Sequence, residues 1–288
     1  MGCFQVRTDL ALEARESIGE ADGEIRGVSV EESYDEKNEI RVTRVVIETK
    51  NGAKAMGKPI GIYTTLEAPR MVEPDENYHQ EISSALAKEL KNIIPESEEE
   101  KSVLIVGLGN RDVTADALGP NVADNLFITR HVVKEYGKAA YSKDRMNMVS
   151  SIVPGVMAKT GMESAEIIKG VVEQTKPDVI LVVDALAARS TKRLNRTIQV
   201  TNTGIHPGSG VGNHRNAITE ESLEVPVVAI GVPTVVDAAT IVNDAVSGEM
   251  DINLAELNNM YVTSKDVDYQ IKQISHVICD AINEALEL

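Results

Sequence analysis

The fold is decided by the stretch VLIVGLGNRDVTADALGP, which spans residues 103–120. It begins with four apolar residues in succession, the pattern of a strand that is buried on both faces of a largely parallel sheet. The glycines that follow permit tight backbone turns, and the last residues open a helical segment. The sequence therefore predicts a buried strand, a loop and a helix in this order.

The same unit recurs outward along the chain. Short apolar runs that suit buried strands occupy residues 103–106, 149–153, 179–183 and 227–230. Helical segments follow at residues 120–129, 164–174 and 237–245, and from residue 266. Because strands and helices alternate, we expect an α/β fold with three layers, αβα, around a mostly parallel or mixed central sheet.

The N-terminal part has a different pattern. Apolar and polar residues alternate at positions 25–30 and 40–47, which indicates strands, and Asn51-Gly52 is a turn dipeptide. This predicts a β-rich beginning that contains a hairpin. The expected organisation is one domain over residues 10–288, made of a β-rich N-terminal subdomain (10–75) and the αβα core (76–288).

Composition restricts the classes of function. The chain holds 29 Lys and Arg against 45 Asp and Glu, a net charge of −16, so most of its surface repels a polyanion and direct binding of nucleic acid is not expected. The only cysteines, Cys3 and Cys279, are far apart and without CxxC spacing, which predicts neither a disulfide framework nor a zinc site. No run of about 18 apolar residues and no secretory signal is present, so we expect a cytoplasmic location without membrane association.

Two aspartates stand where an open α/β sheet places its site, just after buried strands. Asp184 directly follows the apolar run 179–183, where an ionised carboxylate is costly unless it is paired or hydrogen-bonded. Arg189 is its candidate partner. Asp116 lies in the loop after the first buried strand and just before a helix, so it suits either a site or a simple helix N-cap.

Glycine-rich loops near these aspartates supply candidate substrate contacts. Their spacing completes neither a GxxxxGK[ST] nor a GxGxxG phosphate motif, and it lacks the GxSxG of serine hydrolases. The histidines show no HxH or HxxxH pattern, so no metal site is predicted. Backbone N–H groups of these loops are candidate oxyanion donors. The candidates for substrate or oxyanion contacts are Gly109, Asn110, Arg189, His206, Gly208 and Ser209.

Asp116 and Asp184 are the remaining reactive pair, and we take both as candidate catalytic residues. Two carboxylates a few ångströms apart do not both ionise cheaply, so one keeps a proton while the other acts as a base. Such a pair can activate water and protonate a leaving amide. Ser190 and Thr234 lie in the loops after the expected strands and are further candidates for positioning water or substrate, although nothing local ranks them above ordinary turn residues.

Five blocks carry a resemblance to a known family: VGLGNRDVTADALGP, SIVPGVMAKTGMES, DALAARS, GIHPGSGVGN and AIGVPTVVDA. Together they resemble the germination proteases of spore-forming bacteria, from about Arg7 to the C-terminus. The resemblance implies an atypical aspartic endopeptidase that degrades small acid-soluble spore proteins during germination, in the forespore or spore core, and that assembles as a tetramer. The family's two functional aspartates fall on Asp116 and Asp184. The implied fold is similar to that of hydrogenase-maturation peptidases.

The resemblance also implies a zymogen that cuts its own N-terminus at a substrate-like sequence, an acidic residue followed by a hydrophobic residue and Ala. Asp9-Leu10-Ala11 fits this pattern, so we expect a propeptide over residues 1–9 and cleavage between Asp9 and Leu10. A short terminal segment can reach a cleft with little disturbance of the fold. The alternative interpretation is that Asp9 begins a short amphipathic helix.

Hydrogenase-maturation peptidases share a GxGN loop that leads into acidic, metal-contacting positions. This chain has Ala117 after Asp116 where those relatives have a second acidic residue, so we expect catalysis without a metal or other cofactor. Two alternatives stay open, a metal-dependent maturation peptidase that uses the same loops and a noncatalytic module that binds acid-soluble partner proteins. The second is less natural, because an acidic surface and small acidic proteins repel each other.

Overall fold

The computed structural model describes residues 8–17, 25–97, 99–141, 146–208, 216–245, 257 and 260–288. Its strands are β1 (Val28–Asp35), β2 (Ile40–Ile47), β3 (Gly61–Glu67), β4 (Ser102–Gly107), β5 (Met148–Ile152), β6 (Val179–Ala188), β7 (Thr197–Thr201), β8 (Val227–Asp237) and β9 (Tyr261–Val262). Its α-helices are α1 (Ala11–Ser17), α2 (Lys50–Met56), α3 (Glu76–Ile93), α4 (Leu118–Asn125), α5 (Arg130–Tyr136), α6 (Met157–Thr160), α7 (Ser164–Thr175), α8 (Glu220–Leu223), α9 (Ala238–Ala245) and α10 (Val267–Ala285). Short 3-10 helices are η2 (Thr114–Asp116), η3 (Lys138–Tyr141) and η4 (Thr191–Arg193).

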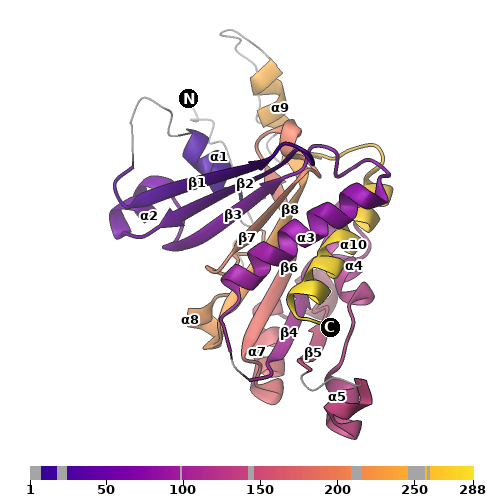
Figure 1. Cartoon of the computed structure of the whole chain (residues 1–288). Helices are drawn as coiled ribbons and strands as arrows, with labels where there is room; N and C mark the ends of the chain where they lie inside the picture. The colour runs from indigo at the N-terminus through magenta and orange to yellow at the C-terminus, as the bar shows by residue number, and fades with distance from the viewer. Residues whose placement is uncertain are drawn as a thin grey trace.

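The described strands form one mixed sheet, in the order β1-β2-β3-β7-β8-β6-β4-β5, with β9 paired to β8. The strands β5, β4, β6 and β8 are parallel to one another and contain the apolar runs. An antiparallel half, β1, β2, β3 and β7, joins them where β7 pairs with β8 (Figure 1). The predicted α/β fold with a mixed central sheet is confirmed.

The N-terminal strands continue this sheet without a break. β3 pairs with β7 from Tyr63, opposite Thr201, to Glu67, opposite Thr197. The β-rich beginning is therefore hydrogen-bonded directly to the part of the sheet that belongs to the core. The division into a subdomain (10–75) and a core (76–288) stays a prediction.

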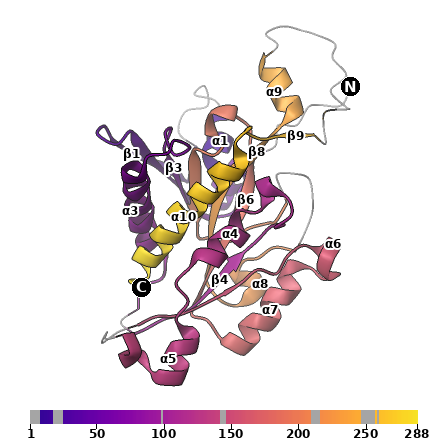
Figure 2. The ribbon, with the colours of Figure 1, turned by 90° about the vertical axis from the view of Figure 1, so that its right-hand side faces the viewer.

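Helices cover both faces of the parallel half, because successive residues of each strand face different cores. Val103 and Ile105 of β4 pack in the cluster with α3, α4 and α10, whereas Leu104 and Val106 pack in the cluster with α7 and α8. Figure 2 shows α3 and α7 on opposite sides of the strands. The three αβα layers of the prediction are present.

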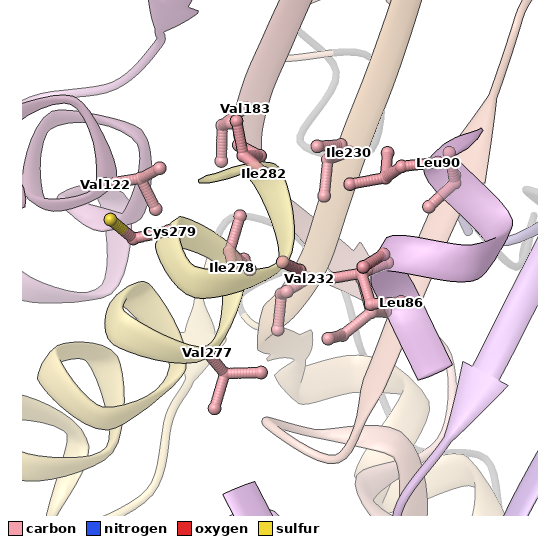
Figure 3. Packing of buried hydrophobic residues seen from close by; sticks show 14 of the residues in the cluster. Leu86, Leu90, Val122, Val183, Ile230, Val232, Val277, Ile278, Cys279 and Ile282 are labelled. Atoms are coloured by element: carbon pink, nitrogen blue, oxygen red, sulfur yellow. The ribbon is translucent and has the colours of Figure 1, made fainter. Parts of the chain in front are cut away.

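The larger core lies under α3 and α10, whose side chains meet those of the sheet in Figure 3. On α10, Ile271, Ile274, Ile278 and Ile282 recur at helical spacing and are buried. Full burial of each such side chain contributes about 1.5–3 kcal/mol. The helix begins at Val267, one residue after the predicted start at Asp266, which is its N-cap. No described helix is long and apolar enough to cross a membrane.

The Asn51-Gly52 dipeptide does not form the predicted turn. It lies inside α2, where the Thr49 side chain accepts the backbone N–H of Gly52 at 3.1 Å. This N-cap satisfies one of the first helical amides, which otherwise lack a partner. The cap therefore favours a helix in place of a turn at Asn51-Gly52. The helix ends at Gly57, which has a left-handed φ of 61°.

Two of the parallel strands, β6 and β8, are longer than the apolar runs that predicted them. β6 continues from residue 183 to Ala188, paired with β8 through an irregularity between Leu186 and Ala187. The sequence predicts Asp184 just after the end of this strand. In the structure Asp184 lies within the strand. The small and apolar residues after Asp184 permit this extension, because they keep pairing with β8.

Candidate active site

A cavity of about 540 Å³ opens where β4, β6 and β8 present their carboxyl-terminal halves. Its lining includes the predicted site residues Gly109, Asp116, Asp184, His206 and Gly208, together with Asp9 of the N-terminal segment. Ser209, also predicted, lies outside the described residues. The fold thus gathers the two aspartates and the loop glycines Gly109 and Gly208 around one space.

Asn110 and Arg189 are described but do not line this cavity. Asn110 contributes its backbone N–H, which donates to Asp116 Oδ2 at 2.9 Å. Arg189 also uses its backbone N–H, which donates to Glu13 at 2.8 Å. Both residues therefore contribute a backbone N–H that holds a carboxylate near the site, that of Asp116 or that of Glu13.

Asp116 ends η2 and faces back to the glycine loop. The N–H of Asn110 donates both to its carboxylate, at 2.9 Å, and to its backbone oxygen, at 3.0 Å. The N-cap of α4 is Ala117, which makes no side-chain capping bond. The alternative that Asp116 is only a helix N-cap is therefore wrong.

Gly109 permits the close approach of these two segments. Its φ is 120°, and a Cβ at this position would lie 1.9 Å from the backbone oxygen of Asp116. Only glycine adopts such a backbone conformation without strain, and only glycine leaves the room. The glycine loop therefore fixes where the Asp116 carboxylate stands.

Asp184 is buried, with 6% of its surface exposed. The sheet register places it opposite Gly231 of β8, and Gly231 opposite Gln199 of β7. Paired residues point to the same face and neighbouring strands are about 4.8 Å apart, so the backbones of Asp184 and Gln199 are about 10 Å apart. Because Gly231 has no side chain, room remains between them for the Leu186 side chain and the cavity.

Thr234 connects two parts of the site. Its hydroxyl donates to the backbone oxygen of Ala115 at 2.6 Å, directly before Asp116. It is 1% exposed and lines the cavity. Thr234 therefore connects β8 to η2 and holds the segment that carries Asp116.

The predicted cleavage site lies against the same cavity. The N–H of Asp9 donates to the backbone oxygen of Ala187 at 3.2 Å, and the N–H of Ala187 donates to Asp9 Oδ2 at 3.0 Å. Leu10 is fully buried in a cluster with Leu186, and Ala11 is fully buried too. α1 begins at Ala11, so Asp9 precedes the helix. Of the predicted propeptide, residues 1–7 lie outside the described residues.

Glu13 anchors this segment. It is 2% exposed and accepts two successive backbone N–H groups, at positions 189–190, at 2.8 and 3.1 Å. It also pairs with Arg193 at 3.3 Å, which in turn pairs with Glu16 and Glu67. Burial opposes the charge of Arg193, but the three carboxylates outweigh it and raise the pKa of this guanidinium.

Two polar side chains that were not among the predicted site residues hold the peptide that joins Asp9 to Leu10. Lys58 Nζ donates to the backbone oxygen of Asp9 at 2.8 Å. Gln199 Nε2 donates to the same oxygen at 3.3 Å, while its Oε1 accepts the N–H of Ala11 at 2.7 Å. Lys58 follows α2 and Gln199 lies within β7, so neither stands in a glycine loop or after an apolar run.

Within the part of the chain that the structure describes, no three His, Cys, Asp or Glu side chains gather as a set that could hold a metal ion. Asp116 and Asp184 come from different elements and line the same cavity. Catalysis without a metal stays a prediction.

Comparison with known proteins assigns the family. The family model described as germination protease matches residues 6–251. The germination protease of Caldanaerobacter subterraneus subsp. tengcongensis is 46% identical and covers 98% of this chain and 94% of its own length. That of Clostridium perfringens is 44% identical, with 99% and 96% covered. That of Priestia megaterium is 46% identical over 84% of this chain and 66% of its own length.

A search of solved structures finds a [NiFe] hydrogenase maturation protease from Thermococcus kodakarensis. It covers 67% of this chain and 98% of its own, with 16% identity and a TM-score of 0.35. The sequence relatives favour a germination protease over the alternative of a maturation peptidase.

Proposed function

The chain belongs to the germination protease family, and from this premise we propose that it is an aspartate-dependent endopeptidase that begins the degradation of small acid-soluble spore proteins during germination. The observation that carries the proposal is that Asp116, Asp184 and the substrate-like Asp9 line one cavity. Its place of action is the forespore or spore core, where those substrates reside.

In the proposed mechanism Asp116 and Asp184 share one proton. The ionised carboxylate takes a proton from water while the water oxygen bonds to the carbonyl carbon of the substrate peptide. When the C–N bond breaks, the departing nitrogen takes a proton from the pair, and the products are a carboxylic acid and an amine. Two carboxylates in one low-dielectric site divide the acid and base roles in this way.

The same site acts on the chain itself. Residues 1–9 are the propeptide, and the Asp9–Leu10 bond is cut to convert the zymogen into the protease. The support is that Asp9 lines the cavity and that Asp9-Leu10-Ala11 has the acidic, hydrophobic, Ala pattern expected of a substrate. The protease assembles as a homotetramer, which sedimentation of the purified chain tests directly.

The deciding experiment is the intact mass and N-terminal sequence of the full chain after mild acidification, beside Asp116→Asn and Asp184→Asn. We expect loss of residues 1–9 in the wild type and intact chains in both variants. Asp112→Asn is the matched control, because Asp112 is an exposed residue of the same loop that does not line the cavity. Processing in all four chains rules out these aspartates as the catalytic pair.

A second experiment tests substrate and metal. The processed chain is incubated with a small acid-soluble spore protein before and after exhaustive chelation. We expect cuts after acidic residues that precede a hydrophobic residue and Ala, at equal rates with and without the chelator. Activity that is lost on chelation and restored by one divalent ion contradicts the metal-independent mechanism.

A further inference from the structure

We propose that Lys58 and Gln199 are catalytic residues that hold the carbonyl oxygen of the scissile peptide and stabilise the negative charge that forms on it. The proposal rests on the proposed function, because it takes Asp9–Leu10 as the bond that is cut. It gives these two side chains the role for which the sequence predicts backbone N–H groups of the glycine loops.

The contacts converge on one oxygen. Lys58 Nζ stands 2.8 Å and Gln199 Nε2 3.3 Å from the backbone oxygen of Asp9. This oxygen belongs to the peptide group that joins Asp9 to Leu10. Donors aimed at an oxygen that becomes anionic are worth more in the transition state than in the ground state, because the charge they meet grows during the reaction.

Gln199 also fixes the register of the bound segment. Its Oε1 accepts the N–H of Ala11 at 2.7 Å, while its Nε2 donates to the oxygen of Asp9. One amide therefore grips the main chain on both sides of Leu10. These contacts involve only backbone atoms of the bound segment, so any substrate whose main chain follows the same path can make them.

The position of Gln199 relative to Asp184 suits this role. Both lie in one row across the sheet, separated by Gly231, and their side chains point to the same face. Gln199 is 7% exposed and its strand is paired on both sides, by β3 and β8. A rigid sheet thus holds a carbonyl-binding amide about two strand spacings from a candidate catalytic carboxylate.

Lys58 supplies the charge. It follows Gly57, which ends α2, and its backbone N–H donates to the backbone oxygen of Ala53 at 3.2 Å. The end of the helix therefore fixes the position of the Lys58 backbone, from which the side chain extends. Burial lowers the pKa of Lys58, while the carboxylates of Asp9 and Glu13 favour its charged form. A cation in a partly dehydrated place acts more strongly on a developing oxyanion than one in water.

The first test is the rate of self-cleavage after mild acidification in full-length Lys58→Met and Gln199→Met. Loss of one oxyanion donor costs about 100- to 1000-fold in rate, so we expect a fall of this size in each variant. Lys54→Met is the matched control, because Lys54 is an exposed lysine of α2, and its rate should equal that of the wild type. Unchanged rates in Lys58→Met and Gln199→Met overturn the proposal.

The second test reads the contact without requiring activity. Asp9-Leu10 is the only Asp-Leu pair in the sequence, so labelling Asp with carbonyl ¹³C and Leu with ¹⁵N marks this one peptide in the NMR spectrum. In the Asp184→Asn chain we expect the carbonyl signal to move upfield when Lys58→Met or Gln199→Met is added, because lost hydrogen bonds leave the carbonyl less polarised. A signal that does not move in either double variant overturns the proposal.

The two tests separate this proposal from the proposed function. A wild-type chain that stays intact on acidification contradicts self-cleavage, and the carbonyl signal then decides on Lys58 and Gln199 alone. A wild-type chain that is processed, with unaltered rates in both Met variants, leaves the aspartate protease in place and rejects the two donors.

Discussion

Replacement of Glu13 by Gln tests how strongly the N-terminal segment is held at the cavity. Glu13 is 2% exposed, accepts two backbone N–H groups and pairs with Arg193. A neutral amide loses the ion pair and turns an NH₂ group toward one of the backbone donors. Removing one partner of a buried pair costs about 3–5 kcal/mol. We expect about 3 kcal/mol here, because Arg193 keeps two other carboxylates.

The assay is amide hydrogen exchange in the full-length Asp184→Asn chain, which the proposed mechanism leaves uncut. The informative amides are those of Ala11 and Ala187, which bond to Gln199 and Asp9 and not to Glu13 itself. Since about 1.4 kcal/mol is a factor of ten, their exchange should rise about 100-fold.

Glu16→Gln is the control for this measurement. Glu16 is 51% exposed and shares Arg193, and an exposed ion pair contributes at most about 1 kcal/mol. Its effect on the two amides should therefore stay below about 5-fold. Equal exchange in Glu13→Gln and Glu16→Gln would refute the anchor role of Glu13.

Three further changes follow from the geometry. Gly109→Ala places a Cβ 1.9 Å from the backbone oxygen of Asp116. We expect the rate of self-cleavage to fall at least about 100-fold, while circular dichroism shows that the chain is folded. A normal cleavage rate contradicts the role of this loop. Thr234→Val removes the hydrogen bond that the hydroxyl donates to the backbone oxygen of Ala115. Urea titrations should show the free energy of unfolding lowered by about 1–3 kcal/mol, and self-cleavage should be slower. An unchanged cleavage rate argues against positioning by Thr234. Burial raises the pKa of the Cys279 thiol to about 11, above the value in an unfolded chain, so at pH 8 the folded chain holds little thiolate. Iodoacetamide should modify Cys279 at least about 100-fold more slowly in the native chain than in urea, as peptide mass mapping measures, and equal rates would show that the thiol is accessible.

The parallel half of the fold follows from sequence because its signal is local. Runs such as residues 103–106 and 179–183 are apolar throughout, and the strands β4 and β6 that contain them are buried on both faces. β7 (Thr197–Thr201) was missed for the opposite reason. It is also fully buried, but Thr, Gln and Thr alternate with its two aliphatic residues and resemble a half-exposed segment. Of these polar residues, Gln199 and Thr201 line the cavity, and Gln199 also bonds to the N-terminal segment.

The candidate site divides in the same way. Asp116 and Asp184 could be found because each follows or ends a strong apolar run at the edge where such sheets place ligands. Lys58 and Gln199 could not, because what distinguishes them is contact with residues far away in sequence. Lys58 reaches Asp9 across 49 positions and Gln199 reaches it across 190. No spacing rule encodes that approach, which depends on how the antiparallel half joins the parallel one.

The burial of Leu10, Ala11 and Glu13 has a consequence for the timing of activation. These residues lie on the C-terminal side of the proposed cut, so breaking the Asp9–Leu10 bond does not by itself remove them from their places. In the proposed mechanism the new N-terminal segment, residues 10–17, therefore stays bound at the cavity after the cut and inhibits the chain as a bound reaction product. A lag between the appearance of the new N-terminus and the first turnover of added substrate would equal the time that residues 10–17 need to leave.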